Sequence, residues 1–311
     1  NMRNLKEDLG IKTSATIGLE MDVLPCSFYF RVNKALEDAS FVDVAERIKH
    51  IRSVKSEFEI KLAKEAAQML VEGFSTVPDH IKEGMTEVEL MCRMESEMRL
   101  MGHQGSLRFR RFNSIVPIGH IMSGSSAAIP SFLASPTGGR GTSVVFPHGP
   151  GYRKIKRNEP VFVDTVGICN GYIADATRIF SLGKIEPELV EAYEASCQIE
   201  EAIAREMKPG RTARELFELS ESEGARLGYG DFLGGPVGSK CGFVGHGVGL
   251  ELDEYPVLAP LDHKIQEGMT IAVEPKIIYP GKGVLGVEDT FLTTSSGALR
   301  LTEMPLEIWE V

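Results

Sequence analysis

The clearest pattern of apolar positions lies in Val161–Phe180, where two runs rich in β-branched and aromatic residues stand on either side of Asn170-Gly171. An Asn-Gly pair between two such runs is a strong short-range signal for a β-hairpin with a two-residue type I′ turn. With these two residues as the loop, Cys169 pairs with Tyr172, and this pair sets the register of the whole hairpin.

In this register two carboxylates share one face of the hairpin. Asp164 lies opposite Thr177 and Asp175 lies opposite Val166, so the two aspartates are diagonal neighbours. Two carboxylates on an otherwise apolar hairpin repel each other and are costly to bury. A bound cation would remove both problems; the alternative is a surface hairpin with solvated acids.

Helical periodicity and end signals predict four long helices. The first has Ile60, Ala63, Ala67, Leu70 and Val71 on one face. Three helices begin with a capping box, and the other begins with a proline. The predicted helices follow Ser56 to about Phe74, follow Thr86 to Gly102, cover Pro187–Met207, and follow Thr212 to Gly228.

Two of these helices belong to an internal repeat. Lys82–Leu90 and Lys208–Leu216 share residues at a fixed offset of 126, and the match continues to Gly102 and Gly228. Chance plus ordinary helix punctuation is one explanation. The other is a duplicated unit of two helices followed by antiparallel strands, which predicts a pseudo-twofold α+β domain with its site between the halves.

The remaining apolar runs predict further strands at Leu107–Ile118, Met269–Ile278 and Val284–Thr293. Between them, residues 119–151 form a long stretch rich in Gly, Ser and Pro, and loops of this length are often functional.

The first 50 residues are mixed and too few for an independent core of usual size. We expect residues 1–50 to be the C-terminal part of an N-terminal domain, or a linker, and residues 51–311 to form the main domain. The local patterns predict strands at Ala15–Leu24 and Cys26–Val32 and helices at Asn33–Asp38 and Val42–Lys49.

The amino-acid composition argues against some classes of binding partner. A net charge of −10 argues against nucleic acid or an anionic membrane as the main partner. The five cysteines are scattered and lack CxxC spacing, as in a reduced, cytoplasmic protein. No apolar run approaches the roughly 18 residues of a membrane span. We therefore expect a cytoplasmic protein that acts on a small molecule.

Three further metal-binding side chains lie at the ends of apolar runs or between glycines. His246 lies within Gly245–Gly249, Glu274 follows Thr270–Val273, and Glu288 follows Val284–Val287. Glutamate rarely ends an apolar run unless it is paired or binds a metal. Together with the aspartates they predict an oxygen-rich site for two divalent cations such as Mn²⁺ or Co²⁺, with Zn²⁺ and Fe²⁺ as alternatives.

The order and spacing of these five residues resemble the "pita-bread" metallopeptidases, which include Xaa-Pro aminopeptidases, prolidases, methionine aminopeptidases and creatinase. The resemblance extends from Ser56 to the C-terminus, and residues 1–48 resemble the last part of the N-terminal domain of the Xaa-Pro branch. It rests on four segments: Asp175–Phe180, Gly245–Leu250, Gly268–Pro275 and Gly286–Thr290.

The resemblance implies a curved antiparallel sheet with outer helices, a homodimer, and a role for each ligand. Asp164 would bind one metal, Asp175 and Glu288 would bridge both, and His246 and Glu274 would hold the other. Glu274 would also carry a proton from the attacking water to the leaving amine.

Three positions depart from the family pattern. Asp253 stands where a second histidine is usual, seven residues after His246. An ionised aspartate can only accept hydrogen bonds, so it would repel an oxyanion. A histidine that precedes the first aspartate in the family corresponds best to His148 and less well to His120, and a frequent arginine is replaced by Gly286.

Three functions are compatible with these patterns. The first is a dinuclear metal-dependent hydrolase that cleaves an N-terminal peptide bond, of the Xaa-Pro dipeptidase or aminopeptidase type. The second is a creatinase-like hydrolase or a lyase that acts on a small non-peptide substrate, which Asp253 favours. The third is a non-catalytic binding protein on the same fold, which the complete set of five ligands disfavours.

Overall fold

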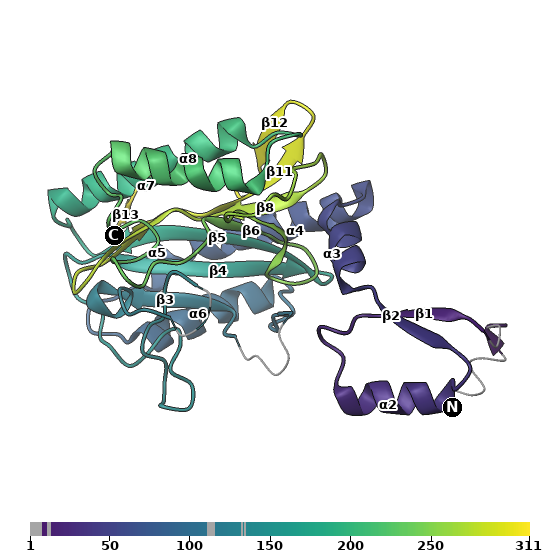
Figure 1. Cartoon of the computed structure of the whole chain (residues 1–311). Coiled ribbons are helices and arrows are strands. Elements are labelled where there is room, and N and C mark those ends of the chain that lie inside the picture. The colour runs from purple at the N-terminus through teal and green to yellow at the C-terminus, as the bar shows by residue number, and fades with distance from the viewer. Residues whose placement is uncertain (1–7, 11–13, 111–115, 132, 134) are drawn as a thin grey trace. The chain divides into compact units, whose positions relative to one another are not determined.

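The computed structural model describes residues 8–10, 14–110, 116–131, 133 and 135–311. The chain forms two compact units (Figure 1), one of residues 1–52 with 110–114 and one of residues 53–109 with 115–311. The second unit carries all five predicted metal ligands.

The smaller unit contains a parallel pair of strands, β1 (Thr16–Leu19) and β2 (Ser40–Asp43), and the helix α2 (Cys26–Ala35). The strand expected at Cys26–Val32 is wrong, because this segment belongs to α2. Val32 and Leu36, four residues apart, are both buried, whereas Phe28 and Phe30 are exposed. The burial therefore follows helical spacing, although the residue types favour a strand. The helix α3 (Ala45–Ser53) ends the segment.

The predicted hairpin is confirmed and forms the centre of a four-stranded sheet. β4 (Val161–Cys169) pairs with β5 (Tyr172–Ser181) in the expected register. Both turn residues have positive φ, 48° at Asn170 and 88° at Gly171, as a type I′ turn requires. The sheet order is β13-β5-β4-β3, with β3 at Gly119–Ser123 and β13 at Trp309–Glu310.

The strand expected at Leu107–Ile118 falls partly on residues 111–115, which lie outside the described residues. Its described flanks, 107–110 and 116–118, are not strand, and β3 begins only at Gly119.

The second half of the large unit forms a five-stranded sheet of order β12-β11-β8-β6-β7 and a separate antiparallel pair, β9 with β10. The two long strands expected here are each interrupted, one at Glu274-Pro275 and the other at Val287-Glu288. The bounds are β6 Gly245–Gly247, β7 Glu254–Val257, β8 Thr270–Val273, β9 Lys276–Tyr279, β10 Gly283–Gly286, β11 Asp289–Thr294 and β12 Gly297–Arg300.

Helices cover both sides of these sheets (Figure 1). The first half supplies α4 (Glu57–Ser75), the short α5 (Val77–His80) and α6 (Glu87–Leu100), and the second supplies α7 (Pro187–Glu206) and α8 (Ala213–Arg226). A single 3₁₀ turn, η1 (Gly124–Ser126), follows β3. One apolar core lies between α4, α6 and the β4–β5 hairpin, and another lies between α7, α8 and the second-half strands.

The internal repeat is visible in the hydrogen bonds of both halves. The N–H of Gly84 donates to Ile155 O, and the N–H of Gly210 donates to Ile265 O at the corresponding place. The capping threonines Thr86 and Thr212 then each form an antiparallel bridge, with Lys154 and Lys264. The predicted pseudo-twofold α+β architecture is therefore confirmed.

Candidate functional site

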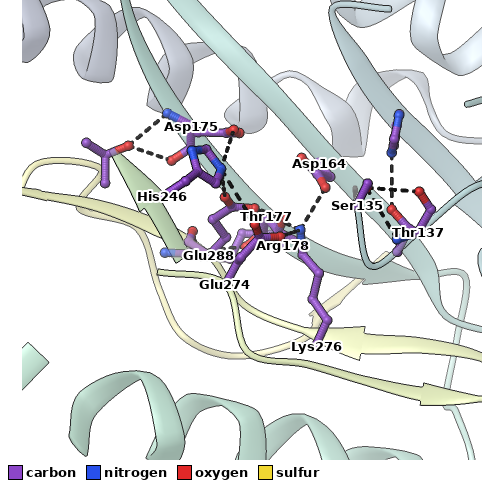
Figure 2. Close-up of polar contacts among 12 residues, drawn as sticks. Ser135, Thr137, Asp164, Asp175, Thr177, Arg178, His246, Glu274, Lys276 and Glu288 are labelled. Atoms are coloured by element: carbon purple, nitrogen blue, oxygen red, sulfur yellow. Dashed lines mark hydrogen bonds and ion pairs between the residues drawn. The ribbon is translucent and has the colours of Figure 1, made fainter. Parts of the chain in front are cut away.

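The structure brings the five predicted ligands together from both halves of the large unit (Figure 2). Asp164 lies on β4, Asp175 on β5 and His246 on β6, while Glu274 follows β8 and Glu288 precedes β11. The Nε2 atom of His246 lies 3.5 Å from Glu274 Oε1, 3.9 Å from Glu288 Oε1 and 4.0 Å from Asp175 Oδ2. Side chains that are more than 100 residues apart in sequence thus share one small volume.

A bridge between the two sheets holds the acidic residues in place. Thr177 and Glu288 form an antiparallel backbone bridge, and Thr177 Oγ1 also donates to Glu288 Oε2 at 2.9 Å. Thr290 Oγ1 accepts from Asp175 N and donates to Asp175 O. The segments that carry Asp175 and Glu288 are therefore joined directly to each other.

A buried ion pair supports the same bridge from behind. Arg178 donates to Glu288 O and makes a two-oxygen contact with Asp289 at 2.9 and 3.0 Å. Both side chains are fully buried. Charge-assisted contacts of this kind fix geometry as well as adding stability, so Arg178 orients the backbone beside Glu288.

The orientation of His246 suits a metal ligand. Its Nδ1 lies 3.0 Å from Leu252 O and 3.2 Å from Gly247 O, and a carbonyl can only accept, so Nδ1 carries the hydrogen. Nε2 then presents its lone pair to the carboxylates. A metal-binding histidine usually donates its second ring N–H to a carbonyl or carboxylate in this way.

Lys276, which the sequence analysis missed, also lies at the centre of the site. Its Nζ donates to Glu274 Oε2 at 2.7 Å and to Asp164 Oδ2 and Glu288 Oε2 at 2.9 Å each (Figure 2). Burial opposes its charge, but these three carboxylates hold the pKa of the ammonium well above its usual value. The signal in the sequence was a lysine at the start of the apolar run Ile277–Tyr279, because lysine is almost never fully buried without partners.

The ionised forms of the carboxylates that face His246 are disfavoured by burial and by their mutual repulsion. Burial, and then the charges of Glu288 and Asp164, raise the pKa of Asp175 well above its usual value. Burial also raises the pKa of Glu288 to about 8. For His246 burial lowers the pKa, but Asp253, Glu274 and Glu288 raise it overall. Bringing a cation to this place would relieve the repulsion among these groups.

A divalent ion fits the side of the site that faces His246. Ligand atoms of Asp175, His246 and Glu288 lie within 4.8 Å of one another. Ligands of a common ion at bond lengths of about 2.0–2.2 Å are separated by roughly 3–4 Å, which matches the measured distances. In addition, Oδ1 of the buried Asp175 has no hydrogen-bond partner among the described residues.

An apolar pocket opens at these residues. A mostly apolar wall around a few convergent polar groups is typical of a small-molecule site. Apolar residues from several loops form most of its wall, including Leu107, Phe109, Val116, Pro117, Leu133, Pro136, Phe243 and Leu252.

The other predicted site residues also line this pocket. The rings of His148 and His120 are 4.3 Å apart, edge to face, and His120 pairs with Asp164 across β3 and β4. Burial lowers the pKa of His148 and lowers that of His120 to about 3, so both are neutral near pH 7. Asp253 lies beside His246, with Oδ1 3.6 Å from Nδ1.

The fold and this acidic, histidine-containing centre define a metal-dependent hydrolase of the pita-bread class. The chain belongs to Metallopeptidase family M24, whose model matches residues 61–295. The model of the Creatinase/Prolidase N-terminal domain matches residues 3–54.

Individual proteins and solved structures are also similar to this chain. An Xaa-Pro dipeptidase of Pyrococcus horikoshii is 30% identical over 300 residues, which are 96% of this chain and 75% of that protein. The X-Pro aminopeptidase structure from Thermotoga maritima has a TM-score of 0.83 at 26% identity, covering 100% of this chain and 78% of the other. The prolidase structure from Pyrococcus horikoshii has a TM-score of 0.78 at 28% identity, covering 98% and 78%.

Among the described residues, no helix combines the length and the apolar character needed to cross a membrane.

Proposed function

We propose that this chain is a metal-dependent dipeptidase that cleaves Xaa-Pro dipeptides. The observation that carries the proposal is the convergence of His246 with buried carboxylates at the floor of an apolar pocket. Two similar proteins, from Pyrococcus horikoshii and Pyrococcus furiosus, are named Xaa-Pro dipeptidases, and the second is 28% identical over 299 residues.

Asp175, His246, Glu274 and Glu288 would hold a divalent ion, and Mn²⁺ or Co²⁺ suits this oxygen-rich set. When bound, such an ion lowers the pKa of water and polarises a carbonyl. For Asp164, the resemblance suggests a further metal contact, although its Oδ2 is bonded to Lys276.

The residues around this centre would supply the other parts of the reaction. Glu274 would take a proton from the attacking water and pass it to the leaving amine. His148, which is neutral near pH 7 and lines the pocket, would donate a hydrogen bond from its ring to the carbonyl of the scissile bond. The apolar wall, with Phe109 and Val116, would accept the proline ring.

The test is a panel of Xaa-Pro dipeptides and matched Xaa-Ala dipeptides, incubated with the protein in Mn²⁺ or Co²⁺. We expect turnover of Xaa-Pro peptides that EDTA abolishes. Glu274→Gln, which keeps the size of the side chain, should lower kcat by about 10²-fold or more. Turnover that persists in EDTA, or none on any peptide with either metal, would contradict the proposal.

One observation favours a second function, creatinase-like hydrolysis or lyase chemistry on a small cationic substrate. Asp253 lines the pocket with about a third of its side chain exposed, and its negative charge would attract a substrate cation. Asp253→His should then raise activity on Xaa-Pro dipeptides. Asp253→His should also lower activity on the cationic molecule. A variant that changes neither activity would exclude this second function.

We also propose a homodimer in the cytoplasm. The family resemblance supports the dimer, and the five unpaired cysteines and the acidic net charge support the location. Light scattering coupled to size-exclusion chromatography would measure the mass in solution, and a single-chain mass would contradict the dimer.

A further inference from the structure

Lys276 is surrounded by carboxylates in the way that a metal ion would be. Three different acidic side chains accept from its Nζ at 2.7–2.9 Å, and they come from β4 and from the ends of two later strands. The lysine itself is only 2% exposed. Its ammonium is therefore a fixed cation of the site.

Glu274 and Glu288 divide their oxygens between the ammonium and His246. Oε2 of each accepts from Lys276, whereas Oε1 of each is directed to His246 Nε2, at 3.5 and 3.9 Å. Both glutamates thus bridge two positions. The ammonium occupies the first, and the second is bounded by Asp175, His246 and the Oε1 atoms.

The neighbouring strand leaves room for this lysine. Gly286 on β10 is paired directly with Lys276 on β9. A Cβ atom at position 286 would lie 2.7 Å from Lys276 Cγ, closer than real Cβ contacts allow. The glycine at 286 thus leaves room for a side chain with a γ carbon at position 276.

We propose that Lys276 takes the place of one metal ion, so that the site binds a single divalent ion at Asp175, His246, Glu274 and Glu288. The inference rests on the metal site of the proposed function but not on its substrate. One divalent ion and the ammonium bring three positive charges to the four carboxylates. A second divalent ion beside the ammonium would exceed their charge and would compete for the same oxygens of Asp164, Glu274 and Glu288.

The Oδ1 atom of Asp175 has no hydrogen-bond partner in the described part of the chain, which supports the second position as the metal site. Asp175 is 5% exposed and makes no bond to the ammonium, so its carboxylate belongs to the side that faces His246. Asp164 belongs to the other side, where Lys276 neutralises it.

The test is a metal count on the metal-stripped protein after equilibrium dialysis against Mn²⁺, measured by elemental analysis and native mass spectrometry without substrate. We expect one Mn²⁺ per chain in the wild type. Lys276→Ala, which removes the ammonium and opens its space, should bind two. Lys276→Met removes the charge but fills the space, so it should bind no more than one.

Lys282→Ala is the matched control, because it removes an exposed lysine that is bonded to Glu186 and Glu188. It should keep the wild-type count. A wild type that binds two ions or none would overturn the proposal, and so would a folded Lys276→Ala that still binds one. If Lys276→Ala does not fold, the wild-type count decides. A protein with one ion that cleaves no dipeptide would lose the proposed function but keep this inference.

Discussion

Asp175 and Asp164 lie on the same face of one hairpin but have opposite energetic roles. Asp164 is neutralised by the ammonium of Lys276 at 2.9 Å. Asp175 has one oxygen without a hydrogen-bond partner among the residues that the structure describes, and its burial together with the charges of Glu288 and Asp164 disfavours its ionised form. In the metal-free protein Asp164 therefore stabilises the fold, while Asp175 weakens it.

This difference gives a paired prediction. Asp175→Asn should raise the melting temperature of the metal-free protein by about 1–2 °C, because about 1 kcal/mol corresponds to roughly 1.5 °C at this chain length. It should also weaken Mn²⁺ binding by at least about 100-fold, since even partners of metal ligands contribute about 10–100-fold. Calorimetry and Mn²⁺ titration measure the two effects.

Asp164→Asn is the control at the matching position. It should lower the melting temperature, because Lys276 loses a charged acceptor in a buried place. Equal changes of melting temperature in Asp164→Asn and Asp175→Asn would contradict the opposite roles of the two aspartates.

At the scale of single residues, the sequence predicted the five candidate ligands that the structure brings together, but it did not predict Lys276. Two of these residues share one face of a hairpin, and the other three end apolar runs or lie between glycines, in an order that resembles a known family. Lys276 has partners 2, 12 and 112 residues away, and only the folded strands bring them to one point.

The helices α6 and α8 are repeated elements with the same start. In each, a threonine side chain accepts from the N–H three residues later, and the glutamate there accepts from the threonine N–H. The two capping boxes make similar contacts, at exposed positions. The two helices should therefore respond alike to loss of the cap.

Thr86→Ala and Thr212→Ala should each lower the free energy of unfolding by about 1 kcal/mol. The double variant should lose the sum of the two free energies, because the two caps share no hydrogen-bond partner. Urea unfolding measures these changes. A lower free energy of unfolding in only one of the two single variants would show that the two caps are not equivalent.

A histidine just after α6 links this helix to β4 in a pH-dependent way. His103 Nδ1 accepts from Gly105 N, so Nε2 donates to Val166 O at 3.1 Å. Burial lowers the pKa of His103 in the folded protein. Protonation would break the bond from Gly105, so the neutral form is the one that folding favours.

This lowered pKa determines whether the stability of the protein rises or falls with pH. Below the ordinary histidine value of about 6.5, the unfolded chain binds the proton more readily, so stability falls as the pH decreases. Between pH 7 and pH 5, the free energy of unfolding should decrease less in His103→Gln than in the wild type. Denaturant unfolding at several pH values measures this, and parallel curves would contradict it.

Which elements could be predicted depends on how local their signals are. Asn170-Gly171 determines the β4–β5 turn by its own backbone preferences, and the caps of α4, α6 and α8 lie within four residues. Cys26–Val32 was assigned wrongly because its residue types favour a strand, while burial of Val32 and Leu36 selects a helix. That selection comes from packing, which a local pattern does not contain.

At the scale of the whole molecule, the site joins the two halves. The first half contributes Asp164 and Asp175, and the second contributes His246, Glu274 and Glu288. A ligand that binds only the folded state stabilises it in proportion to the logarithm of its concentration. A bound metal therefore stabilises the contact between the halves as well as the site.

Mn²⁺ at about 100 times its dissociation constant should stabilise the wild type by about 2.7 kcal/mol relative to protein in EDTA. The measurement is a melting curve at several Mn²⁺ concentrations. Mg²⁺ at the same ionic strength serves as a control for non-specific ion effects. Asp175→Asn should show little of this shift, and a full shift in that variant would place the ion elsewhere.

The bridge from Thr177 to Glu288 also affects how the molecule forms during synthesis on the ribosome. The β4–β5 hairpin emerges first, with two aspartates on one face, while Lys276 and the later glutamates are still to be translated. Until they arrive, those aspartates remain best hydrated, so this face of the nascent hairpin resists premature collapse. The late segment then brings its own cation, the ammonium of Lys276, to Asp164 on the hairpin.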